Sequence, residues 1–209
     1  MFGGTEGFAF SKKFTRFDLV TRTWSEVVVA NAVAVTAISR LNIVGPEEMY
    51  KHLAVVCHQG SMPRLIIFGG ENGQRRFETV HEFDFTSKKW TLVNAKNNGL
   101  LKARFAHSAT IAHGDGKVYI YGGTSVEDEY FDNVLSYDTE ARSFERVRVT
   151  NDRESMPTGR DFHQAALITD DTTKLPALLV IGGKGKKSLN PGSNGRMSDI
   201  IKLGLPPES

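Results

Sequence analysis

The sequence has 209 residues, 40% of them apolar, which is enough to build a substantial core. Its 26 basic and 24 acidic residues leave a formal charge of +2, so composition indicates no nucleic-acid-binding surface, and the longest apolar run, 27–35, is too short for the ~20 residues of a membrane span. The single cysteine, Cys57, cannot form an internal disulfide and the first residues lack a secretory signal pattern, so we expect the cytoplasm, or else the nucleus.

Four glycine pairs, each behind an apolar residue, divide the chain into units. They stand in "MFGG" (1–4), "IFGG" (67–70), "IYGG" (120–123) and "VIGG" (180–183). Fourteen or fifteen residues after each of the first three pairs an aromatic residue precedes Asp, and six residues later another aromatic follows. These positions are Phe17, Asp18 and Trp24; Phe83, Asp84 and Trp90; and Tyr137, Asp138 and Phe144. So many matches at fixed offsets indicate an internal repeat.

Each unit is predicted to form four short β-strands, because apolar runs alternate with turn residues and no stretch keeps a helical period. The clearest unit places its strands at 107–113, 117–123, 133–138 and 143–149. The first two runs are largely apolar, as in strands buried on both faces, whereas the fourth alternates apolar with charged residues, as an edge strand does. An Arg-x-x-His motif precedes the first strand in "ARFAHSAT" (103–110) and "GRDFHQAA" (159–166), with "MYKHLAVV" (49–56) as a weaker copy.

The units differ at the two ends of the sequence. We place them at 1–27, 49–95, 103–150 and 159–205. The first holds only the third and fourth strands and the last lacks the fourth, which gives roughly 13 strands by this reading of the pattern. Residues 28–48 form a longer and more apolar insert than the other connections, and we favour packing of this insert against the sheets over an exposed interface.

This pattern resembles the kelch repeat, which combines Arg-x-x-His, a glycine pair, an aromatic-Asp pair and a later aromatic residue. The resemblance covers nearly the whole chain and implies an all-β fold, a partial β-propeller of four-stranded antiparallel blades. The propeller would not close within this chain, so the remaining blades would come from a longer chain or from a second copy. The whole of 1–209 is then a single incomplete propeller domain.

Carried over by position, the resemblance gives structural roles to two groups of residues. Turn glycines would be Gly69, Gly70, Gly122, Gly123, Gly182 and Gly183, where the backbone needs a positive φ or a close approach. Packing between neighbouring blades would involve Trp24, Trp90 and Phe144.

Three features suggest chemistry, and each also has a structural interpretation. His52, His107 and His163 open the first strands of successive blades and could converge on a metal, but we favour packing of each within its own blade. Cys57 lies in an apolar strand and is expected to be buried and inert, so the copper site of the sugar-oxidising kelch-type propeller has no counterpart and no cofactor is expected. The motif at 182–188 fails as a phosphate loop because Lys187 replaces the required hydroxyl, which leaves a basic loop at 184–196.

The loops between strands 2 and 3 and between strands 4 and 1 should emerge on one face of the propeller, because strands within a blade alternate in direction. Candidate binding residues in these loops are Arg75, Arg76, Glu127, Asp128, Glu129, Tyr130, Phe131, Lys184, Lys186 and Lys187. Charges of both signs beside aromatic residues are typical of a surface that binds a protein. We therefore expect a non-enzymatic protein-binding scaffold of unknown partner. The alternative is a kelch-like enzyme or specifier protein acting at the channel mouth.

Overall fold

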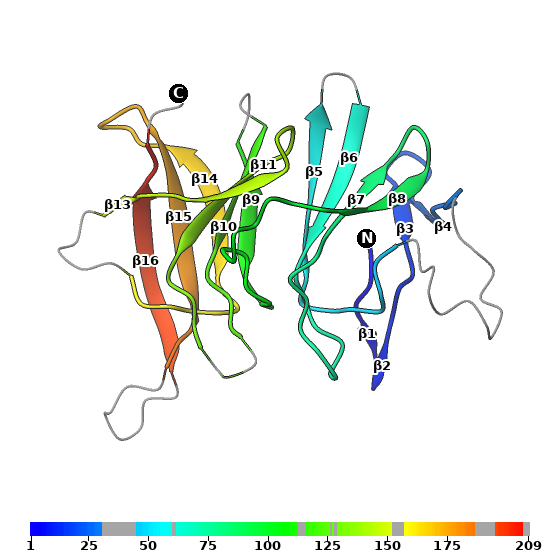
Figure 1. The fold of residues 1–209 in the computed structure, drawn as a ribbon, viewed down its shortest axis with the longest axis horizontal. Helices are drawn as coiled ribbons and strands as arrows, with labels where there is room; N and C mark the ends of the chain where they lie inside the picture. Colours follow the sequence, from blue (N-terminus) through cyan, green and yellow to red (C-terminus); the bar gives the residue numbers. More distant parts are fainter. Residues whose placement is uncertain are drawn as a thin grey trace.

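The computed structural model describes residues 1–30, 45–59, 62–112, 116–125, 127, 129–151, 157–186 and 195–206. Within these ranges 16 strands form three four-stranded and two two-stranded antiparallel sheets, which stand side by side in chain order (Figure 1). The all-β partial propeller of four-stranded antiparallel blades predicted from the repeat is confirmed, and the described sheets do not close into a ring. No helix in the described part of the chain has the length and apolarity to cross a bilayer.

The second and third blades are complete. The second contains β5 (Leu53–Gln59), β6 (Met62–Phe68), β7 (Val80–Asp84) and β8 (Lys89–Val93). The third contains β9 (Ser108–Ile111), β10 (Lys117–Tyr121), β11 (Val134–Asp138) and β12 (Ser143–Arg146). In both blades the strands pair in sequence order, and β9 lies beside β5 on one side and β14 on the other. The first strand of each blade therefore faces the centre of the fan.

The Asp of the repeated aromatic-Asp pair closes the turn between the third and fourth strands. Asp84 Oδ1 accepts the N–H groups of Thr86 at 2.8 Å and Ser87 at 2.9 Å. Asp138 repeats this arrangement in the third blade, as Asp18 does in the first. An Asp side chain that accepts the backbone N–H groups two and three residues later favours a tight turn. This explains why Asp stands at this position of the motif.

The first and fourth units each carry a strand element that the sequence pattern did not predict. In the first, β3 (Thr15–Asp18) pairs with β4 (Thr23–Glu26), and a small hairpin of β1 (Thr5–Glu6) and β2 (Ala9–Phe10) precedes them. In the fourth, β14 (Gln164–Thr169), β15 (Pro176–Lys184) and β16 (Arg196–Gly204) are joined by β13 (Thr150–Asn151), which pairs outside β16. The total exceeds the roughly 13 strands expected, and Thr150 belongs to the fourth sheet rather than to the third blade.

The aromatic residue of the fourth strand packs against the preceding blade. Trp90 is 4% exposed and its ring centroid lies 5.4 Å from that of Phe2 and 5.5 Å from that of Phe14. Phe144 is 3% exposed and contacts Phe68 of the second blade in the same way.

The expected burial of Trp24 is wrong. This side chain is 60% exposed, because β4 belongs to a sheet that has a described neighbour on one side only. The indole stacks instead on Phe17, with 5.1 Å between the two ring centroids. Its position in the repeat is the same as that of Trp90, but no described blade covers it.

The glycine pairs and the Arg-x-x-His motifs meet at the boundary between blades. Gly69 has a φ of +58°, and a Cβ there would lie 2.5 Å from the Arg104 carbonyl oxygen and 2.9 Å from His107 Cε1. The next N–H, of Gly70, donates to the same Arg104 carbonyl at 2.8 Å. Both the positive φ and the close approach require glycine here. Gly122 meets Arg160 and His163 in the same manner at the following boundary.

The connection 28–48 lies mostly outside the described residues. Its two described flanks lie near the first and second blades, since Val29 packs against the cluster that contains Trp90 and a Cβ on Gly45 would lie 3.3 Å from the indole of Trp90. The expected packing of residues 31–44 falls outside the described ranges.

Candidate functional site

One face of the fan gathers the turns that join second to third strands. The β1–β2 hairpin and the segments from β6 to β7 and from β10 to β11 lie together at the lower edge of the molecule (Figure 1). We call this the loop face. Loops carried on a rigid scaffold are the usual place for binding residues.

At the inner end of the loop face, the residue before each strand-opening histidine adopts a left-handed backbone conformation. Lys51, Ala106 and Phe162 have φ values of +52°, +52° and +53°. The N–H of Ala106 donates to the Lys51 carbonyl at 2.9 Å, and the N–H of Phe162 donates to the Ala106 carbonyl at 2.9 Å. This chain of hydrogen bonds links three blades and fixes equivalent side chains around the channel mouth.

Lys51 is surrounded by aromatic rings from three blades. Its Nζ lies 4.5 Å from the ring centroid of Tyr50, 4.6 Å from that of Phe105 and 5.4 Å from that of Phe162. It also donates to Glu71 Oε1 at 2.7 Å. Burial opposes the charge on Lys51, but the hydrogen bonds to Glu71 and Tyr50 outweigh it and raise the pKa of the ammonium group. Lys51 is therefore a fixed cation at neutral pH.

Arg76 completes this arrangement. Its guanidinium lies 4.6 Å above the Phe105 ring, and its Nε is 3.6 Å from Glu71 Oε2. We define the mouth cluster as Tyr50, Lys51, Glu71, Arg76, Phe105 and Phe162. Phe162 is 56% exposed, so the cluster presents an aromatic ring and two partly exposed cations to solvent.

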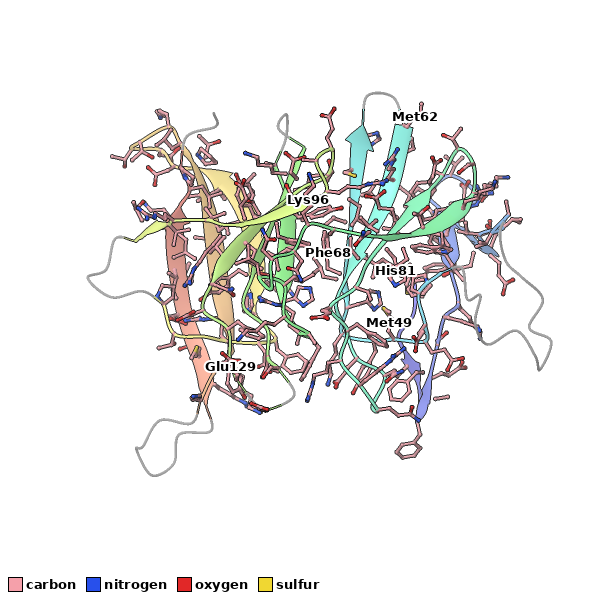
Figure 2. The ribbon with its side chains drawn as sticks, in the orientation of Figure 1. Met49, Met62, Phe68, His81, Lys96 and Glu129 are labelled. Atoms are coloured by element: carbon pink, nitrogen blue, oxygen red, sulfur yellow. The ribbon has the colours of Figure 1, made fainter. Side chains whose placement is uncertain are left out.

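The other residues proposed from the sequence lie farther out on the loops. The Arg75 side chain is 59% exposed and pairs with Glu47, and its guanidinium lies 5.1 Å from the Phe77 ring. Glu129 forms an exposed ion pair with Lys102 at 3.7 Å (Figure 2). Exposed ion pairs of this kind contribute little to folding.

The remaining loop residues do not form one cluster. Glu127, Lys184 and Lys186 are exposed and Tyr130 is half-buried. Lys184 belongs to β15, where its backbone exchanges hydrogen bonds with Asp161. Asp128 and Lys187 lie outside the described residues.

Phe131 is not the exposed contact that the loop sequence suggested. It is 6% exposed, and the guanidinium of Arg104 covers its ring at 4.1 Å. The N–H of Phe131 donates to the Gly123 carbonyl at 2.9 Å, which closes the loop and turns the ring inward. Phe131 therefore packs inside the blade and is unavailable to a partner.

The strand-opening histidines lie beneath the glycine pair of the preceding blade, not within their own blade as expected. His52 forms a hydrogen bond with the backbone of Phe2, and His163 forms one with the backbone of Tyr121. Burial lowers the pKa of both imidazoles to about 4 and that of His107 to about 3, so all three are neutral at pH 7. Within the described ranges, no group of three or more His, Cys, Asp or Glu side chains is placed to hold a metal.

Cys57 is buried, as its apolar surroundings in the sequence predicted. Burial raises the pKa of its thiol, which disfavours the reactive thiolate.

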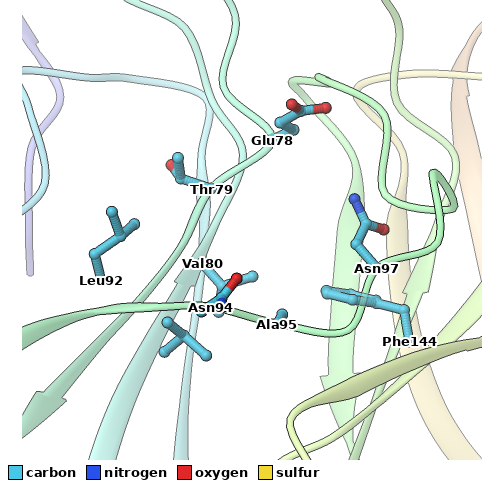
Figure 3. Close-up of a pocket in the computed structure, with 9 residues that line it drawn as sticks. Glu78, Thr79, Val80, Leu92, Asn94, Ala95, Asn97 and Phe144 are labelled. Carbon is cyan, nitrogen blue, oxygen red and sulfur yellow. The ribbon is translucent and has the colours of Figure 1, made fainter.

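A groove of about 420 Å³ runs between the outer strands of the second and third blades (Figure 3). Leu92 and Val93 of β8 form one part of its lining and Phe144 of β12 another, with Glu78 and Asn97 as polar members. Its apolar floor with a few polar side chains could hold an extended segment of another chain.

Comparison with known proteins identifies the family to which the chain belongs. Residues 1–203 match the model described as "KLHDC2/KLHL20/DRC7 Kelch-repeats domain". The chain belongs to the kelch-repeat family. It is 27% identical to Kelch domain-containing protein 10 of Xenopus tropicalis over 98% of this chain and 44% of that protein, and 26% identical to the human protein of that name over 98% and 41%. It is also 25% identical to the flagellar outer arm dynein alpha chain of Chlamydomonas reinhardtii over 86% of this chain and 4% of that protein.

The chain spans less than half the length of the Kelch domain-containing protein 10 relatives that it matches. The function proposed for this chain therefore rests on its own residues.

Most of the mouth cluster was missed in the sequence, although the kelch repeat contains the signal that could have found it. Tyr50 and Lys51 occupy the two variable positions of Arg-x-x-His in the second blade, and Phe105 and Phe162 occupy one such position each in the next two. Superposing the repeats places these positions around the channel mouth. Only Arg76 had been identified from loop charge.

Proposed function

We propose that this kelch-repeat chain is a non-enzymatic protein-binding module whose binding surface is the loop face, centred on the mouth cluster. Kelch propellers in general mediate binding between proteins, which supports the broad function. The observation that supports the choice of surface is the grouping of Lys51 and Arg76 with an exposed Phe162 at the point where three blades meet. The single buried cysteine supports a location in the cytoplasm or the nucleus.

The composition of the mouth cluster suits a protein partner. Aromatic side chains and Arg are enriched where binding energy concentrates, because aromatic rings bury a large area at a small cost in side-chain entropy and Arg presents several hydrogen-bond donors from one planar group. Glu71 compensates part of the charge of Lys51 and Arg76, which leaves a small net positive charge instead of the broad basic field that suits a polyanion. The backbone ladder through Ala106 holds these groups in place before binding, which lowers the entropic cost of association.

The proposal predicts that Lys51→Glu removes a bound partner. The substitution places a carboxylate beside Glu71 and under the rings of Tyr50 and Phe105, so both the charge and the cation–π contacts are lost. We expect affinity capture from cell extract to recover at least about tenfold less partner with this variant than with the wild type.

Lys88→Glu is the matched control, because Lys88 has the same charge and a similar φ of +58° but lies in the β7–β8 turn, away from the loop face. It should capture the same proteins in the same amounts as the wild type. Equal capture by all three baits would contradict the assignment of the mouth cluster.

A further inference from the structure

A cavity of about 170 Å³ opens beside the third strand of the second blade. Its lining consists of Gly45, Glu47, Met49, Arg75, Phe77, Thr79, His81 and Leu92. Arg75 and Leu92 are largely exposed, so the cavity is accessible from solvent. Inside it, His81 (labelled in Figure 2) is 8% exposed and its Nδ1 has no hydrogen-bond partner, and the hydroxyl of Thr79 is also buried without one.

The third and fourth blades show what occupies the equivalent place. Arg104 is fully buried and donates from Nη1 to the Gly122 carbonyl at 3.0 Å and to Asn133 Oδ1 at 3.2 Å, while its guanidinium lies 4.1 Å from the Phe131 ring. Arg160 likewise donates to the Gly182 carbonyl at 2.9 Å and to both carboxylate oxygens of Asp199 at 2.7 and 3.1 Å. In both blades a buried guanidinium thus donates to the carbonyl of the first glycine of the pair and to a polar side chain, and in the third blade it also lies against an aromatic ring.

The second blade keeps counterparts of the groups around that guanidinium but has a buried methionine in place of the arginine. Met49 stands where Arg104 and Arg160 stand, three residues before the strand-opening histidine. Thr79 takes the place of Asn133, since each precedes the first residue of the third strand. Phe77 takes the place of Phe131, because each donates its N–H to the second glycine of the pair in its own blade. The register also aligns His81 with Leu135, so a polar side chain replaces an apolar one here.

We propose that this cavity binds a guanidinium group, and that in the cell an arginine side chain of a bound protein supplies it. The group would stack on Phe77 and donate to the Thr79 hydroxyl and to His81 Nδ1. The part of the proposal that concerns a protein partner rests on the proposed function. The guanidinium site itself follows from the repeat and does not depend on that function.

The charges around the cavity agree with this ligand. Burial lowers the pKa of His81 to about 4, so at neutral pH the imidazole is uncharged and its Nδ1 is able to accept a hydrogen bond. Glu47 in the lining is 37% exposed and attracts a cation. It pairs with Arg75, whose side chain is 59% exposed and whose guanidinium lies 5.1 Å from the Phe77 ring, so the bound guanidinium takes the place of Arg75 on that ring. A planar guanidinium can stack on an aromatic ring while donating in its own plane, which an ammonium group cannot do.

The test is an NMR titration of the whole chain with methylguanidinium chloride, which reports on the imidazole resonances of His81. We expect a saturable shift with a Kd on the order of 10 mM, as suits a fragment of a few heavy atoms. Methylammonium chloride at the same concentrations should shift His81 much less. The absence of a saturable His81 response to methylguanidinium, or an equal response to both cations, would overturn the proposal.

Two variants separate the cavity from non-specific binding. Met49→Arg supplies the missing guanidinium from within the chain, so the His81 resonances should no longer respond to the probe. Thr79→Val keeps the shape but removes one acceptor and should weaken binding about tenfold, which also provides a test if Met49→Arg does not fold. Unchanged affinity in Thr79→Val, or an undiminished response in folded Met49→Arg, would contradict the site. Because the titration uses no protein partner, its outcome is independent of the Lys51→Glu experiment.

Discussion

Replacing Trp90 by alanine is expected to lower the free energy of unfolding by about 3–5 kcal/mol, whereas replacing Trp24 should cost less than about 1 kcal/mol. The two residues occupy the same position in the repeat. Trp90 is 4% exposed among the rings of Phe2, Phe14 and Phe83, so its loss leaves a cavity at the boundary between two blades. Trp24 is 60% exposed and contacts mainly Phe17, so little packing is lost.

Urea unfolding of the two variants and the wild type, followed by circular dichroism, measures this difference directly. Far-ultraviolet dichroism is preferable to fluorescence because the chain has only two tryptophans. Equal destabilisation by the two substitutions would mean that Trp24 is covered in solution. A cost below about 1 kcal/mol for Trp90→Ala would contradict the packing between the first and second blades.

Acidification from pH 7 to pH 4 is expected to destabilise the fold strongly. Four buried or half-buried imidazoles have lowered pKa values, about 3 for His107 and about 4 for His52, His81 and His163, because burial disfavours their charged form. In the unfolded chain each would bind a proton below its ordinary pKa of about 6.5. The free energy of unfolding is therefore independent of these histidines above about pH 6.5. It decreases as the pH falls toward 4, by up to about 1.4 kcal/mol per pH unit for each histidine.

The measurement is the urea midpoint at intervals between pH 7.5 and pH 4. His107→Gln should reduce the slope of stability against pH, because one buried titrating group is removed. His58→Gln is the control for the substitution itself, since His58 is exposed on β5. A midpoint that stays constant from pH 7 to pH 4.5 would show that these imidazoles are solvated.

The fold could be predicted from the sequence because each motif position has a local physical cause. Asp84 recurs because it caps the turn between the third and fourth strands, and Gly69 recurs because a Cβ would meet the Arg104 carbonyl. A position in the repeat does not show whether a neighbouring blade packs against it. Trp24 therefore shares its motif position with Trp90 but not its burial.

The candidate site was harder to predict because it is built from several blades at once. The charged loop tips, such as Glu129, were visible as sequence runs, but the mouth cluster joins Lys51, Phe105 and Phe162 from three separate repeats. Phe131 was misassigned because the direction of its ring depends on a backbone hydrogen bond to Gly123. The second blade has Met49 at the Arg position of the Arg-x-x-His motif, and this substitution in the sequence marks the blade that has the cavity beside His81.

Site-specific photo-crosslinking in cells tests the central claim, that the loop face binds a protein, most directly. A photoreactive phenylalanine analogue replaces Phe162 in the mouth cluster in one variant and Thr86 in the β7–β8 turn in another, and both side chains are exposed. We predict a discrete crosslinked protein from position 162 that position 86 does not give, and that Lys51→Glu removes in the same chain. Crosslinking of the same protein from position 86 alone, or equally from both positions, would contradict the assignment of the loop face.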